Sequence, residues 1–109
     1  MAEEKTKDYA IGHRERVRRK FLENGFNGFE DYEVLELLLF YVIPRRDTKA
    51  IAKELIAKFK TLANVLKADY RELKTINGLG DVAITFLKMI GALPARIYKD
   101  ELKNKKLIK

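Results

Sequence analysis

A run of apolar residues that ends at a proline constrains the fold of this 109-residue chain more than any other feature. Residues 34–44 contain one polar side chain, Glu36, and the longest uninterrupted apolar run is Leu37–Pro44. A helix that crosses a bilayer needs about 20 apolar residues, so this run is too short to span a membrane. A helix that is apolar on nearly every face is instead buried. We therefore predict a central core helix that begins at Asp31 or just before, where Asp31 or Glu30 accepts from free N–H groups, and that ends ahead of the proline.

The rest of the chain also has helical spacing, and no segment alternates apolar and polar residues over the length that a strand needs. We predict an all-α domain, a compact bundle of five to six helices. Residues 1–10 are expected to form a flexible N-terminus, 11–98 the helical domain and 99–109, with five lysines, a basic tail or linker. The other expected helices cover residues 11–24, 48–59, 62–66, 70–75 and a segment from Asp81 onward, with a bend at Gly91 and Pro94.

Composition excludes several classes of protein. The chain has no cysteine and a single histidine, His13, which excludes a disulfide framework, a thiolate metal site and a zinc site built on several imidazoles. Hydrophobic residues make up 47% and charged residues 36%, too apolar for disorder and too charged for a membrane protein. The N-terminus is acidic, unlike a secretory signal, so we expect a cytoplasmic protein. No nucleophile and base are paired in the sequence, and we predict neither enzymatic activity nor a cofactor or metal.

The charge of the chain favours a polyanionic partner. Lysine and arginine number 23 against 16 acidic residues, a formal net charge of +7. Residues 26–42 carry four acidic side chains and no basic one, whereas residues 43–60 carry six basic and two acidic ones. The basic surface is therefore expected to be localised.

The segment Leu73-x-x-Ile76-Asn77-Gly78-Leu79-Gly80, followed by an amphipathic helix, is typical of a helix–hairpin–helix motif. Its glycines permit positive φ and let backbone N–H groups approach a phosphate, at which the next helix points its positive end. Leu79 is expected to turn inward as an anchor. The alternative is a helix C-cap and tight turn without a ligand. Ile84 stands where the motif has a small residue, and Asp81 places a carboxylate at the mouth.

A second turn, Ile43–Lys49, also lies between two expected helices. Its side chains Arg45, Arg46 and Lys49 suit phosphate oxygens, and Asp47 is the expected N-cap of the next helix. The alternative is a solvated basic turn that pairs with the acidic helix before it. If both turns are hairpins, the domain is a tandem helix–hairpin–helix unit.

The first helix supplies a third candidate, because Arg14 and Arg18 share one face at i and i+4 and could follow a nucleic-acid backbone. The alternative for this pair is a solvated charged surface. His13 is expected to be a capping or surface residue.

The chain resembles the N-terminal domain of the RadC-like bacterial proteins, the UPF0758 family. The likeness covers residues 11–98 and is carried by GHRERVRRKFLENGF (12–26), DYEVLELLLFYVIPRRDTKAIAKELIAKF (31–59) and INGLGDVA (76–83). It implies a helical domain with a helix–hairpin–helix motif and an association with DNA repair. Such proteins usually continue into a metallopeptidase-like domain of the JAB/MPN type, whose His-x-His motif this chain lacks, so we expect that half to be absent.

Two functions follow from these observations. The first is a DNA-binding module that contacts phosphates without reading sequence, through the three candidates above, on duplex, branched or single-stranded DNA. The second is a protein-interaction or regulatory domain for a metallopeptidase-like or other partner, without direct DNA binding. The second is favoured by an apolar surplus beyond one core: Phe26, Phe29, Tyr32 and Tyr41.

Overall fold

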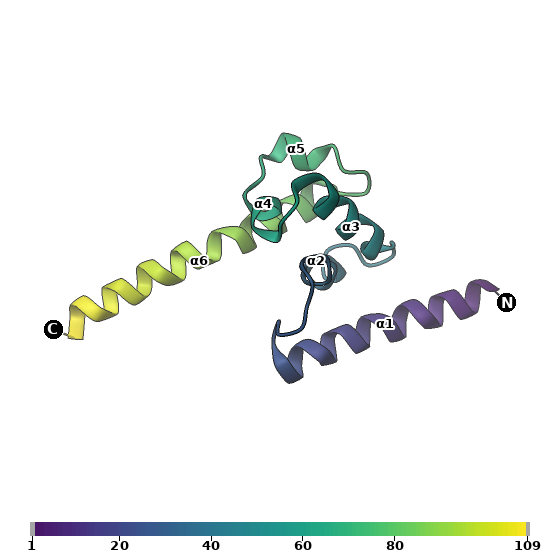
Figure 1. Ribbon diagram of the computed structural model, residues 1–109, viewed down its shortest axis with the longest axis horizontal. Coiled ribbons are helices and arrows are strands. Elements are labelled where there is room, and N and C mark those ends of the chain that lie inside the picture. The colour runs from purple at the N-terminus through teal and green to yellow at the C-terminus, as the bar shows by residue number, and fades with distance from the viewer. Residues whose placement is uncertain (1, 109) are drawn as a thin grey trace.

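The computed structural model describes the backbone of residues 2–108 and the side chains of residues 12–105, and this part of the chain is helical with no strand. The helices, shown in Figure 1, are α1 (Ala2–Asn24), α2 (Asp31–Phe40), α3 (Thr48–Phe59), α4 (Leu62–Lys67), α5 (Tyr70–Lys74) and α6 (Asp81–Ile108). The predicted all-α fold is confirmed. No helix within the described residues is long and apolar enough to cross a membrane.

Helix α2 lies at the centre of the core, as its apolar faces predict. Leu35 and Leu39 are fully buried, and α2 packs most extensively against α3. The Glu30 N–H donates to Glu33 Oε1 (3.0 Å) at the start of the helix. Asp31 does not cap its own helix, because its Oδ2 accepts from the N–H of Leu62 (2.9 Å) and so ties the start of α2 to that of α4.

Helices α3, α4, α5 and α6 close the main core around α2. Asp47 is the N-cap of α3, as predicted, and its Oδ1 accepts from the N–H groups of Lys49 (3.0 Å) and Ala50 (3.2 Å). Fully buried side chains from four elements meet in this core: Leu55 of α3, Val65 of α4, Leu73 of α5, and Ile84 and Leu87 of α6.

Helix α1 packs on the opposite side of α2 through a second, smaller cluster. Val17 meets Leu37 and Phe40 there, with Phe29 against them. The helix begins at Ala2 and not at Ile11 as predicted. Residues 2–10 are rich in alanine, glutamate and lysine, which are strong helix formers and extend the helix without an apolar stripe. The mobility predicted for residues 1–10 stays a prediction.

Helix α6 continues through Gly91 and Pro94 as one element. Gly91 serves packing, because a methyl group there would lie 2.8 Å from the carbonyl oxygen of Leu66 in α4. The segment 99–108, predicted as a tail or linker, is the end of this helix.

The C-terminal half of α6 projects from the bundle (Figure 1). Every residue from 92 to 105 is exposed. The radius of gyration is 16.4 Å, whereas a compact domain of this length has about 13 Å. The domain is therefore a small bundle that carries an extended helical arm.

Candidate nucleic-acid interface

The turn between α5 and α6, called the hairpin turn below, contains one glycine at positive φ. Gly78 has a φ of +88°, a region that L side chains rarely adopt. Leu79 is buried and its N–H donates to the carbonyl of Ile76 (3.2 Å), so its side chain anchors the turn, as predicted. Gly80 has no positive φ, and a Cβ atom placed on it would meet no other atom within 4 Å. This corrects the prediction that both glycines supply positive φ.

The turn before α3 lies directly against this hairpin. A methyl group placed on Gly78 would lie 2.7 Å from Nη1 of Arg46 and 3.0 Å from Cδ1 of Ile51. The missing side chain thus leaves the space in which the guanidinium of Arg46 sits. The two predicted candidates, Arg46 and Asn77–Gly78, therefore form one surface.

A shallow groove of about 320 Å³ marks this junction. Two carboxylates lie in it beside the arginine, while Arg45 and Lys49 are exposed next to it in sequence. The groove is lined by Arg46, Asp47, Ala50, Ile51, Glu54 and Asn77. Asp47 and Glu54 repel anions from the groove itself, so an anion is favoured at its basic rim, which consists of the exposed Arg45, Arg46 and Lys49.

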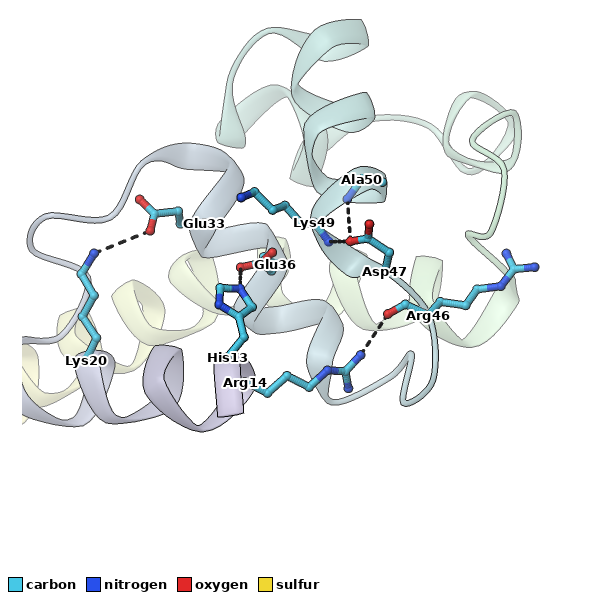
Figure 2. A network of polar contacts seen from close by, with 9 residues as sticks. All are labelled: His13, Arg14, Lys20, Glu33, Glu36, Arg46, Asp47, Lys49 and Ala50. Atoms are coloured by element: carbon cyan, nitrogen blue, oxygen red, sulfur yellow. Dashed lines mark hydrogen bonds and ion pairs between the residues drawn. The ribbon is translucent and has the colours of Figure 1, made fainter. Parts of the chain in front are cut away.

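Arg14 of α1 stabilises the turn before α3 through hydrogen bonds to backbone carbonyls. Its guanidinium donates to the backbone carbonyls of Phe40 (3.3 Å), Ile43 (2.9 Å) and Arg46 (3.2 Å) and lies over the Phe40 ring. Figure 2 shows Arg14 reaching the Arg46 carbonyl while the Arg46 side chain extends away from it. Burial, and then the nearby charge of Arg18, lowers the pKa of Arg14. Arg14, predicted to contact phosphate, donates in this structure to carbonyls at the end of α2 and in the turn after it.

His13 pairs with a buried carboxylate. Its Nε2 lies 3.0 Å from Oε1 of Glu36, the one polar residue of the apolar α2 run, and Figure 2 shows the pair between α1 and α2. The sequence predicts a capping or surface histidine, and the structure corrects this to a contact that joins two helices. Within the described residues, no three His, Cys, Asp or Glu side chains are grouped to hold a metal ion.

Asp81, at the mouth of the hairpin, is engaged by α5. Its Oδ1 accepts from Lys74 Nζ (2.8 Å) and from the Tyr70 hydroxyl. These hydrogen bonds lower the pKa of Asp81, and the same carboxylate raises the pKa of Lys74 and of Tyr70. The first turn of α6 thus has its own anion. Ile84, where the motif has a small residue, is fully buried in the core.

Sequence reasoning missed Tyr70 and Lys74 as parts of the hairpin mouth. Both belong to the five-residue helix that precedes the glycines, and a lysine in the last turn of that helix is the signal that could have identified one of them. Sequence reasoning also missed Lys58, whose Nζ donates to the Glu72 carbonyl (3.2 Å) and to Thr75 Oγ1, fixing α3 to the end of α5.

Comparison with known proteins gives one consistent result. The model of the UPF0758 N-terminal family matches residues 10–85. A UPF0758 protein of Fusobacterium nucleatum is 67% identical over 97 residues, which cover 89% of this chain and 42% of that protein. A UPF0758 protein of Ruegeria pomeroyi is 36% identical over 100 residues, which cover 92% of this chain and 45% of that protein.

The chain thus spans less than half the length of these curated relatives. No solved structure matches it. Because the family model covers most of the chain, the protein belongs to the UPF0758 family and corresponds to its N-terminal domain.

Proposed function

We propose that this domain binds the phosphate backbone of DNA without reading base sequence, as a non-enzymatic module. The observation that carries the proposal is the seating of the Arg46 guanidinium on Gly78, which joins the turn before α3 to the α5–α6 hairpin. The basic turn before α3 and the glycine-containing turn between α5 and α6 then act as one surface. The RadC-like resemblance associates such a module with DNA repair.

The proposed contact is the rim formed by Arg45, Arg46 and Lys49. All three are exposed, and guanidinium groups form paired hydrogen bonds with phosphate oxygens. The amides around Asn77–Gly80 contribute backbone donors beside this rim. Leu79 serves as the buried anchor of the turn, because its N–H already donates to the Ile76 carbonyl, and Arg14 serves by holding the Arg46 carbonyl. Arg18 lies on the α1 face next to Arg14 and extends the positive charge.

The experiment measures binding to labelled duplex, forked and single-stranded DNA by fluorescence anisotropy at about 50 and 200 mM salt. Phosphate binding predicts saturable signals with an affinity that falls steeply as salt rises, because bound counterions are released. The double variant Arg45→Glu, Arg46→Glu should lose binding, since it reverses the charge of the rim while the core stays intact.

A matched control separates a defined rim from diffuse charge. The double variant Lys103→Glu, Lys105→Glu makes the same change in net charge on the projecting end of α6, far from the turn before α3 (Figure 1). It should weaken binding only modestly. Equal losses in the two variants would show that net charge alone attracts DNA and would refute the rim.

A second candidate function is a protein-interaction or regulatory domain for a metallopeptidase-like partner. It is favoured by an exposed apolar cluster at the end of α1, where Leu22 is 81% exposed and Phe26 stacks near Phe21 with ring centroids 4.7 Å apart. Tyr41 is also exposed. This function predicts that Phe26→Ser abolishes partner binding, measured by titration calorimetry with the C-terminal half of a UPF0758 relative, and leaves DNA binding unchanged.

A further inference from the structure

An apolar stripe on α6 is left uncovered by the bundle. Val82 is 72% exposed, Met89 60%, Leu93 49% and Ile97 54%, with Phe86 half-buried between the first two. These positions repeat at intervals of three and four residues, so they share one face of the helix. The N-terminal part of the stripe borders a groove of about 370 Å³ lined by Val42, Asp81, Val82, Thr85, Phe86 and Met89.

The projecting half of α6 has little to stabilise it within the bundle. Residues 92–105 are all exposed, and Pro94 removes one backbone hydrogen bond from the helix interior. An isolated helix of this length is marginal in water even without a proline. A helix that carries an apolar stripe along such an arm is best explained by a partner that packs on it.

The spacing of the stripe identifies the kind of partner. Val82 and Ile97 form one pair and Phe86 and Leu93 a second, and both pairs are centred on the same point between Met89 and Ile90. Met89 belongs to the stripe, and the half-buried Ile90 lies beside it. The stripe therefore matches itself when a second helix is laid across it in the opposite direction. A self-matching patch is what a two-fold symmetric interface requires.

We propose that two copies of this chain associate through their α6 helices in antiparallel orientation. The projecting half of one α6 then fills the groove beside Val42 on the other copy, with Ile97 opposite Val82 and Leu93 opposite Phe86. The contact runs along about 22 Å of helix, from the rise of 1.5 Å per residue. This surface is separate from the proposed DNA-binding rim, so the proposed dimer does not depend on DNA binding.

The charges beside the stripe agree with this register. Asp81 of one copy falls opposite Tyr98 of the other, one position before Lys99, so an acidic position of one copy lies toward a basic position of the other. Lys88 and Arg96 fall opposite the uncharged Gly91 and Ala83. Within the paired part of α6 this register sets no two like charges directly opposite each other, although each copy carries a net charge of +7.

Sedimentation velocity over about a hundredfold range of concentration tests the dimer. A contact between two single helices is smaller than a standard protein–protein interface. We therefore expect a dissociation constant in the micromolar range or weaker. Met89→Glu, at the centre of the stripe, should raise the dissociation constant at least about tenfold and leave the helical circular dichroism signal unchanged. Leu102→Glu is the matched control, because Leu102 is an exposed apolar residue of the same helix outside the stripe.

Cysteine cross-linking tests the orientation, and the chain contains no cysteine of its own. Met89→Cys, beside the symmetry axis, should form a disulfide dimer on oxidation. Val82→Cys mixed with Ile97→Cys should cross-link, whereas Val82→Cys alone should not. Cross-linking of Val82→Cys with itself would overturn the antiparallel arrangement. A monomer at every concentration, or equal loss of the dimer in Leu102→Glu, would overturn the proposal and leave the stripe to a different protein.

Discussion

Gly78 and Gly80 look equivalent in the sequence, and the structure gives them different tasks. Gly78 combines a positive φ with the close approach of Arg46 and Ile51. Gly80 has neither property, and it stands before the first residue of α6, with its carbonyl accepting from the N–H of Ile84 (3.0 Å). One residue thus permits the junction of the two turns, while the other begins a helix.

Gly78→Ala should destabilise the protein by about 1–2 kcal/mol, the cost of holding an L residue at positive φ. It should also displace the Arg46 guanidinium, because the new methyl group needs its space. Thermal unfolding followed by circular dichroism measures the first effect, and DNA anisotropy the second. Gly80→Ala is the control and should stay within about 0.5 kcal/mol of the parent. Similar losses in both variants would contradict the account of Gly78.

Asp81→Asn tests the contact at the hairpin mouth through its pH dependence. Hydrogen bonds from Lys74 and Tyr70 hold the pKa of Asp81 below its ordinary value, so the folded state binds a proton there less readily than the unfolded chain. The stabilisation is complete above the unfolded pKa of about 4 and is lost as the pH falls through the lower, folded pKa.

At pH 7 the parent should therefore unfold at a higher urea concentration than Asp81→Asn. The difference between the two urea midpoints should shrink as the pH falls. The exposed Asp69, at the N-cap of α5, supplies the control Asp69→Asn. A difference between the parent and Asp81→Asn that persists unchanged below about pH 3 would rule out the ionised carboxylate as its source.

At the scale of elements, Arg14 joins α1 to the end of α2. Its three carbonyl partners belong to the residues that end α2 and to the turn that presents Arg46. If the Arg14 side chain is removed, these carbonyls lose a charged donor, which lowers the free energy of unfolding by about 1–3 kcal/mol. Arg14 thereby acts on the rim as a positioning residue.

Arg14→Lys distinguishes positioning from charge, because it keeps the charge and loses the planar fork. If Arg14 positions the turn, Arg14→Lys should be destabilised nearly as much as Arg14→Gln in urea unfolding, and both should bind DNA less well. Arg18→Gln, the control one turn away, should keep its stability. A lysine variant that matches the parent in both measurements would assign Arg14 a direct role with phosphate.

The elements were predictable from sequence wherever local chemistry decided them. The apolar run ending at Pro44 located α2, and Asp47 located the start of α3. The early start of α1 was not predictable from periodicity, because residues 2–10 are helical through propensity without an apolar stripe. Gly91 and Pro94 indicate a bend in the sequence. In the structure, Gly91 is needed because a side chain there would collide with the backbone of Leu66, which lies far away in sequence.

The candidate site was predictable only as separate pieces. Arg46 and Gly78 were singled out for different reasons, and nothing local shows that they touch, since 32 positions separate them. The sequence indicates a surface cation at Arg14, because the carbonyls that it meets lie at the end of α2 and in the turn after it, far away in sequence. Side chains that engage backbone groups leave no pattern in a sequence, whereas caps and glycine turns do.

At the scale of the whole molecule, shape and charge are unevenly distributed. The bundle holds the core, while the longest dimension, 65 Å, runs from the end of α6 to the start of α1 (Figure 1). Residues 99–109 of that arm carry five lysines and two acidic residues, so they supply +3 of the net charge of +7. The charge at the end of the arm is therefore separable from the fold.

A chain that ends at Tyr98 tests this separation. Residues 99–105 are all exposed, so the melting temperature should change by less than about 3 °C. The net charge falls from +7 to +4, which should weaken DNA binding a few-fold and reduce its dependence on salt, because fewer counterions are released. The shortened chain keeps Arg45, Arg46 and Lys49, so it should still bind. Complete loss of binding would move the interface from the rim to the arm, and a large fall in melting temperature would show that the arm packs on the bundle or on a second copy.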